Sequence, residues 1–246
     1  MMELRVIFDG KKKGFWNMAL DESLLFYLKD YGPTLRFYGW APPAISVGYF
    51  QSLEENVNVE EAKRRGVDVV RRITGGGAVY HKWEVTYSIV IPPPPGKVLD
   101  SYKIIERGII EGFKKLGIEA QYAGVNDIIV QGKKISGNAQ TRKYGGLLQH
   151  GTILMDVDVD EMFSLLKVPE EKIRDKIIKD VKHRVTSLSH LGIDIDFEEL
   201  QKVLAEGFEK ALGTRIYEES VDEKILKKAR KLEVEKYASR KWNYRR

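Results

Sequence analysis

The stretch VVRRITGGGAVYHKWEVTYSIVI (Val69–Ile91) places three consecutive glycines between two runs of β-type residues. Two arginines precede the glycines and a histidine follows them. Glycines destabilise strands, so three of them at this position suggest a role that compensates for the lost strand stability. Arginine guanidinium groups and bare backbone amides both bind anions. The stretch therefore predicts an anion site on a sheet, with a flexible hairpin loop as the alternative.

Two familiar glycine-rich phosphate sites do not fit this stretch. A P-loop needs a lysine after its glycines and then a helix whose N-terminus faces the phosphate. Thr74–Gly77 has no such lysine, and the residues that follow alternate as a strand does. The dinucleotide-binding fingerprint of a doubly wound sheet fails for the same reason. Both are excluded here.

The rest of the chain alternates strand-type and helix-type patterns. The expected strands are Leu4–Phe8, Thr34–Trp40, Ala44–Phe50, Val67–Ile73, Ala78–Ile91, a meander over Ile118–Asp156 and a short strand near Tyr217. The expected helices are one capped by Asn17, Val57–Arg65, Ser101–Leu116, Asp160–Leu166, and Phe197–Leu212 between Asp196 and Gly213. Strict strand–helix–strand alternation is rare, which favours an α+β fold with a mixed, largely antiparallel sheet flanked by helices. We expect one domain over residues 1–246.

Composition narrows the chemistry. The 246 residues include no cysteine, which excludes disulfides, thiolate metal sites and a cysteine nucleophile within this chain. No signal-type core and no apolar run of membrane-spanning length is found, so a cytoplasmic protein without membrane contact is expected. The net charge of +5 is concentrated in residues 221–246, which hold ten Lys or Arg and four Asp or Glu. This basic helical tail is either a solvated face or a contact for an acidic partner.

Two further stretches carry polar groups suited to the same anion. GVNDIIVQGKKISGNAQTR (Gly124–Arg142) contains Asn126 and Asp127, whose oxygens suit Mg²⁺, and the lysines 133 and 134 between glycines. LLQHGTILMDVD (Leu147–Asp158) contains His150 within an apolar strand. A lysine on a strand is commonly a surface residue, and a lone histidine is commonly structural. The alternative for Lys134 is an inward cation that binds a carboxylate and a phosphate.

Taken together, these motifs resemble the lipoate–protein ligase family, with its octanoyltransferase relatives and the biotin–protein ligases. Residues 71–81 are similar to the family's RRxTGGGAVYH segment, residues 124–140 to its GxNDIxxxGKKISGNAQ segment, and His150–Thr152 to its HGT segment. Residues 17–22, 36–40 and 237–244 also fit. The resemblance implies a biotin/lipoate-ligase-like catalytic domain. It also implies activation of lipoic acid by ATP with Mg²⁺ to lipoyl-AMP, and transfer of the lipoyl group to a lysine.

The resemblance also assigns roles to individual residues. It places Lys134 as the catalytic lysine, in contact with both ATP and lipoate. The ATP side is expected to comprise Arg72, Gly77, Ala78, Val79, Tyr80 and Lys134. The lipoate side is expected to comprise Gly75, Gly76, His81, His150 and Lys134, with Asn126 and Asp127 near Mg²⁺. The aromatic side chains of Tyr38 and Trp40 either receive the acyl chain or belong to the core.

Two departures from the family leave alternatives open. SGNAQTR, LLQHGTIL and the YAS–WNYRR ending resemble a branch that transfers octanoyl groups from a carrier protein with a cysteine, which this chain lacks. The C-terminal accessory domain of many ligases is also missing, so a separate accessory protein is one expectation. ATP-dependent ligation is favoured over transfer without ATP, and a non-catalytic acyl-adenylate-binding module is the distant alternative. The expected partners are lipoyl-domain proteins, namely the glycine cleavage H-type carrier and E2 subunits, and not nucleic acid.

Overall fold

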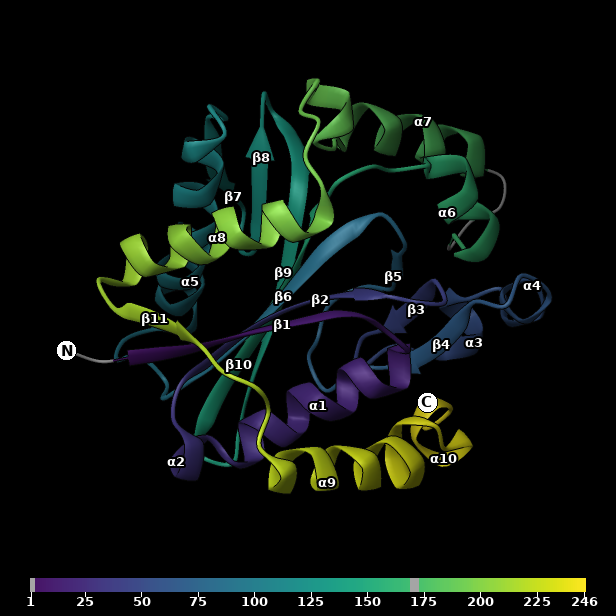
Figure 1. Cartoon of the computed structure of the whole chain (residues 1–246). Helices are drawn as coiled ribbons and strands as arrows, with labels where there is room; N and C mark the ends of the chain where they lie inside the picture. The colour runs from purple at the N-terminus through teal and green to yellow at the C-terminus, as the bar shows by residue number, and fades with distance from the viewer. Residues whose placement is uncertain (1–2, 169–172) are drawn as a thin grey trace.

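A computed structural model describes residues 3–168 and 173–246. It contains a large eight-stranded sheet and a small three-stranded sheet (Figure 1). The large sheet has the order β11-β1-β2-β6-β10-β9-β8-β7. Its strands are β1 (Glu3–Lys12), β2 (Thr34–Trp40), β6 (Glu84–Ile91), β7 (Ala120–Ala123), β8 (Asp127–Val130), β9 (Lys133–Lys143), β10 (Gly146–Leu154) and β11 (Arg215–Glu218). Among the described residues of the large sheet, only the β11–β1 and β1–β2 pairs are parallel, so the expected mixed, largely antiparallel sheet is confirmed.

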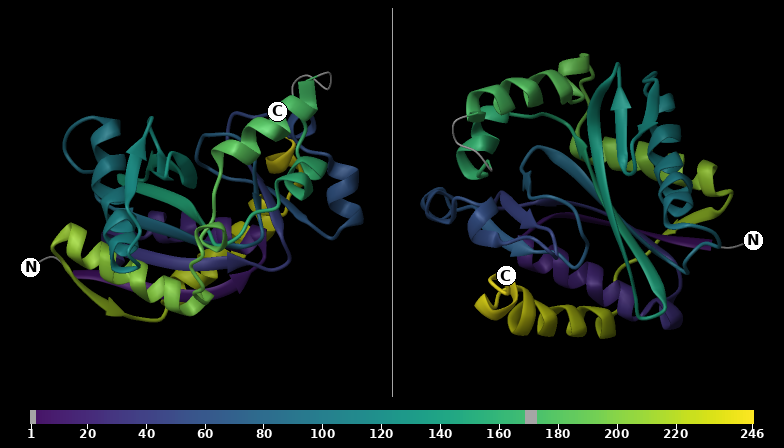
Figure 2. Two further views of the ribbon diagram at one scale, coloured as in Figure 1. Left: turned by 90° about the horizontal axis from the view of Figure 1, so that it is seen from above. Right: turned by 180° about the vertical axis from the view of Figure 1, so that it is seen from behind.

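Helices cover both faces of the large sheet (Figures 1 and 2). On one face, α5 (Val98–Lys115) and α8 (Phe197–Leu212) bury the side chains of residues such as Val6, Phe37 and Tyr87. On the other face, α1 (Gly14–Phe26) and α9 (Glu223–Leu232) cover their strand neighbours, for example Ile7 and Tyr38. Successive side chains of a strand point to opposite faces, so these apolar runs serve two cores at once.

The small sheet lies beside this body and has the order β4-β3-β5. Its strands are β3 (Ala44–Val47), β4 (Asp68–Arg71) and β5 (Val79–His81), and it packs with α3 (Leu53–Asn56), α4 (Val59–Arg64) and α6 (Val159–Leu165). The remaining helices are the short α2 (Leu28–Tyr31), α7 (Arg174–Arg184), the single-turn η2 (Ser189–Leu191), η3 (Glu233–Tyr237) and α10 (Arg240–Asn243). None of the helices in the described ranges is long and apolar enough to cross a membrane.

Several element predictions are confirmed and others are wrong. The strand at Thr34–Trp40 and the helix at Phe197–Leu212, capped by Asp196 and Gly213, are confirmed. Asn17 is not a cap, because the helix already begins at Gly14 and Asn17 is buried inside it, where it donates to the Gly39 carbonyl oxygen.

The single strand expected over residues 78–91 is in fact two strands. β5 belongs to the small sheet and β6 to the large one, and Lys82 and Trp83 connect them. The chain therefore passes from the small sheet to the large sheet at Lys82 and Trp83. These two residues line a cavity between the sheets.

The basic tail packs against α1 through its apolar face, with Ile225, Ala229 and Tyr237 buried. Its charged face remains exposed. Buried Glu22 of α1 accepts hydrogen bonds from Lys236 and Tyr237, which ties the tail to the body. The apolar side of the tail is therefore packed against the rest of the protein, while its charged side faces solvent.

Candidate functional site

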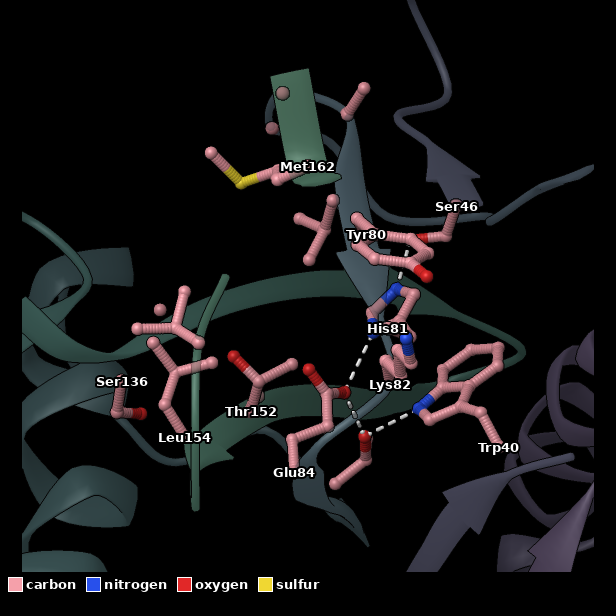
Figure 3. Close-up of a pocket in the computed structure, with 18 of the residues that line it drawn as sticks. Trp40, Ser46, Tyr80, His81, Lys82, Glu84, Ser136, Thr152, Leu154 and Met162 are labelled. Atoms are coloured by element: carbon pink, nitrogen blue, oxygen red, sulfur yellow. Dashed lines mark hydrogen bonds and ion pairs between the residues drawn. The ribbon is translucent and has the colours of Figure 1, made fainter. Parts of the chain in front are cut away.

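A cavity of about 320 Å³ lies between the small sheet, strands β9 and β10, and helices α6 and α7 (Figure 3). Its wall combines apolar and aromatic side chains with a few polar groups. The apolar part includes Met18, Tyr38, Trp40, Val79, Tyr80, Leu154, Val159, Met162, Val181 and Val185. Tyr38 and Trp40, for which the sequence left two readings, are buried and also line this space. A volume and lining of this kind suit a small ligand with an apolar chain.

The glycine loop, Thr74–Gly77, connects β4 to β5 and borders the cavity through Gly76 and Gly77. Arg72 is buried and donates to the carbonyl oxygens of Gly75 and Gly77, at 2.7 Å each. Gly76 has φ +91°, and a Cβ there would lie 2.9 Å from Nη2 of Arg72. A side chain at this position is therefore disfavoured both by the positive φ and by the close contact with Arg72.

Arg72 is thus the internal support of the glycine loop. Its Nη1 donates to the carbonyl and the hydroxyl oxygen of Ser46, at 2.9 and 3.0 Å. Burial lowers the pKa of Arg72 to about 10. Arg72 does line the cavity, but its donors are used by backbone and Ser46 oxygens, and this differs from a free anion donor.

Arg71, the neighbouring arginine, points away from the cavity. Its Nη1 donates to the carbonyl oxygens of Gly48 and Gln51, and its Nη2 to that of Asn243 at 2.8 Å. The sequence predicted one anion site from these two arginines. Arg71 ends β4 and Arg72 follows it directly, and successive side chains of an extended chain point to opposite sides, so the two guanidinium groups bind different parts of the protein.

Lys134 enters the cavity from β9, beside an irregularity in the pairing of β8 with β9. Its Nζ lies 2.8 Å from Oδ1 of Asp127, and its side chain is 43 % exposed. A Cβ at Gly137 would lie 2.9 Å from this Nζ. The glycine therefore gives the lysine room to lie across the strand.

Asn126 and Asp127 do not fit the expected Mg²⁺ site. The Asp127 carboxylate is paired with Lys134, and the Asn126 side chain donates to the carbonyl oxygen of Asn138. No group of three His, Cys, Asp or Glu residues in the described ranges is arranged to hold a metal ion. This pair instead orients Lys134 and fixes the loop before β8.

His81 is part of a buried hydrogen-bonded chain at the cavity wall (Figure 3). Its Nε2 lies 2.8 Å from Oγ of Ser46, and its Nδ1 lies 2.7 Å from Oε1 of Glu84. The imidazole stacks on Trp40 with ring centroids 4.0 Å apart. Sequence reasoning missed Ser46 and Glu84, because nothing in the chain order shows that β3 pairs with β5.

His150 is the centre of a second buried chain. Its Nε2 lies 2.7 Å from Oγ1 of Thr74, and its Nδ1 lies 3.4 Å from Oδ2 of Asp21. Burial lowers the pKa of His150, although Asp21 opposes this effect. Burial alone would raise the pKa of Asp21, but hydrogen bonding to His150 and the charge of Arg36 lower it overall. His150 therefore fixes Thr74 at the start of the glycine loop.

The fold is that of a catalytic domain of the biotin/lipoate ligase superfamily. The chain belongs to the family of the lipoyl protein ligase A/B catalytic domain, whose model matches residues 13–209. The expected family and fold are both confirmed.

Similar proteins of known name divide between transferases and ligases. The chain is 37 % identical to octanoyltransferase LipM of Kyrpidia tusciae and 35 % identical to that of Bacillus subtilis, with 100 % and 98 % of both chains covered. Among solved structures, an archaeal bi-partite lipoate protein ligase from Thermoplasma acidophilum is 31 % identical with a TM-score of 0.91, covering 99 % of this chain and 97 % of the other. A lipoate-protein ligase A bound with ATP is 28 % identical with a TM-score of 0.87, covering 99 % of both chains.

The expectation of an ATP-dependent ligase is wrong. The full-length relatives at 34–37 % identity are named octanoyltransferases, and a transferase moves a group that its donor already carries in activated form. ATP and Mg²⁺ are not supported as cofactors by these relatives. Lipoylation, protein modification and transferase activity remain the supported description.

Proposed function

We propose that this chain transfers an octanoyl-type acyl group from an activated donor to a lysine amine of a lipoyl-domain protein, without using ATP. The observation that carries the proposal is an apolar cavity with the Lys134 side chain in its wall. An acyl chain fits the apolar wall, and Lys134 offers a positive charge to the carbonyl oxygen. Eight octanoyltransferase relatives at 34–37 % identity support the reaction type.

The lack of cysteine in this chain favours direct transfer. The acceptor amine attacks the acyl carbonyl carbon and forms the C–N bond. The bond from that carbon to the sulfur or phosphate oxygen of the donor breaks. With a thioester donor, the proton lost by the amine converts the leaving thiolate to a thiol; with an acyl-adenylate donor, AMP leaves as an anion and the proton passes to solvent. Lys134 stabilises the oxyanion that develops on the carbonyl oxygen, while the glycine loop lets the donor approach the backbone closely.

The acceptor assignment is supported by a structural relative. The archaeal bi-partite ligase is described together with its E2 lipoyl domain, and 99 % of the present chain superimposes on it. A lipoyl-domain protein, either an E2 subunit or a glycine cleavage H-type carrier, is accordingly the acceptor in our proposal.

Intact-mass measurement of a recombinant E2 lipoyl domain tests the proposal. Three mixtures contain the chain with octanoyl thioester on an acyl carrier protein, with octanoyl-AMP, or with octanoate, ATP and Mg²⁺. We expect an octanoyl mass gain with at least one activated donor and none with octanoate and ATP. A gain only in the ATP mixture, or in none of the three, would overturn the proposal. A lipoyl domain with Arg in place of its target lysine is the matched control.

A further inference from the structure

Cations and aromatic rings gather on the surface behind the glycine loop. We define this cationic–aromatic patch as Lys143, Arg245, Arg246, Tyr49, Phe50 and Trp242. Its members come from the segment after β3, the end of β9 and the end of the chain. No expectation drawn from the sequence brought these three segments together.

Each cation of the patch lies over an aromatic ring. The Cζ of Arg245 is 4.2 Å from the ring centroid of Tyr49, and the Nζ of Lys143 is 5.3 Å from the same centroid. The Cζ of Arg246 is 5.5 Å from the centroid of Phe50, whose side chain is 67 % exposed. Such contacts are typical of cations that are held in place but still accessible.

The cations of the patch have no acidic side chain as partner within the described residues. Lys143, Arg245 and Arg246 have no Asp or Glu partner there, whereas Lys236 next to them is paired with Glu22. Burial lowers the pKa of Arg71, and the charges of Arg245 and Arg246 lower it further. The patch therefore concentrates positive charge that an anionic partner would neutralise.

The patch adjoins the cavity through the glycine loop. The amide of Tyr49 donates to the carbonyl oxygen of Thr74 at 2.9 Å, and a Cβ at Gly48 would lie 2.0 Å from the carbonyl oxygen of Gly76. On β9, Ala139 lines the cavity, and Lys143 follows four residues, about 13 Å, further along the strand. A protein bound to the patch is thus within reach of the cavity.

We propose that the cationic–aromatic patch is the docking surface for an acidic face of the acceptor protein. This inference rests on the proposed function, in which the acceptor delivers a lysine to the cavity. A lysine in neutral or basic surroundings would be repelled by Lys143 and Arg245, whereas flanking carboxylates would reverse the sign of the interaction. Complementary charge of this kind mainly increases the association rate and selects the partner, and the exposed ring of Phe50 adds apolar contact area.

Binding of an E2 lipoyl domain to the chain, measured by calorimetry without any acyl donor, tests the inference. The test variant is Lys143→Glu/Arg245→Glu. The matched control is Lys103→Glu/Lys202→Glu, which changes the net charge equally on exposed residues of α5 and α8, across the sheet. At about 50 mM salt, where screening is weak, we expect the test variant to weaken binding by about tenfold or more. We expect the control to change binding by less than about twofold.

Equal affinity of the two variants would overturn the inference. A second result would also overturn it. If duplex DNA bound the chain through Lys143 and Arg245, while binding of the lipoyl domain did not depend on these residues, the patch would be a nucleic-acid contact. Because the measurement uses no donor, absence of acyl transfer by the wild type would count against the proposed function alone. Equal melting temperatures of the two variants exclude misfolding as the cause of a loss.

Discussion

Lys134 lines the apolar cavity, with Asp127 as its ion-pair partner. We expect Lys134→Ala to lower acyl transfer by at least about 100-fold, because loss of one donor to a developing oxyanion costs that much. The side chain is 43 % exposed, so its removal leaves no buried gap. Transfer rates by mass spectrometry, with melting temperature as the fold control, check this. Wild-type turnover in the variant would remove Lys134 from the mechanism.

Glu106 on α5 is a buried carboxyl group whose Oε1 has no hydrogen-bond partner. Burial raises its pKa to about 8, and the charge of Asp127 contributes. Between its ordinary value of 4.5 and about 8, the folded chain therefore holds a proton that the unfolded chain has released. Folding stability conferred by this group is lost as pH rises through that window.

Glu106→Gln removes this dependence. We expect the melting temperature of the variant, relative to the wild type, to be higher at about pH 9 than at about pH 5. Glu119→Gln, on an exposed residue, serves as the control and should show no such change. The idea fails if the difference between variant and wild type is the same at both pH values.

At the scale of elements, the crossing of α5 and α8 depends on facing glycines. A Cβ at Gly207 would lie 2.3 Å from the amide nitrogen of Gly112 and 2.4 Å from the carbonyl oxygen of Gly108. These neighbours are backbone atoms, so the helices would have to move apart. We expect Gly207→Ala to destabilise the fold by about 1–3 kcal/mol, measured by urea unfolding. An unchanged or raised stability would show that the helix pair adjusts without cost.

The pattern of apolar residues predicted most elements because their neighbours lie in the same segment. Phe197–Leu212 has its cap, its apolar face and its terminating glycine within reach of one helix. The change of sheets at Lys82 and Trp83 was missed, because β5 and β6 are both β-type runs and differ only in their partners. α7 was also missed, since its few apolar residues, Ile177, Ile178 and Val181, are only partly buried.

At the scale of the whole molecule, the last turn of the chain holds the strand before the glycine loop. Oδ1 of Asn243 accepts from the amide of Arg71 at 2.7 Å, and the Trp242 indole donates to the carbonyl oxygen of Arg71 at 2.8 Å. The residues are separated by 172 and 171 positions in sequence. The basic tail is therefore a support for the site as well as a charged surface.

Asn243→Ala tests this support. It leaves the buried amide of Arg71 without its acceptor, so we expect a loss of about 1–3 kcal/mol in unfolding free energy. We also expect a drop in transfer rate, as the glycine loop loses its fixed position. Lys241→Ala, two residues before Asn243 on an exposed side chain, should change neither quantity. Full stability in Asn243→Ala would mean that another group satisfies the amide.

The sequence by itself determined the family, the mixed sheet and several of the residues that line the cavity, because the glycine, histidine and lysine motifs are short local patterns that can be recognised before the fold is known. Tertiary structure alone decided what those residues contact. Arg71 and Arg72 are neighbours in sequence, yet one supports the tail and the other the glycine loop. Asp127 pairs with Lys134, because the turn between β8 and β9 brings the two strands side by side. Charge pairing and burial depend on neighbours in space, and those arise only when the strands are in register.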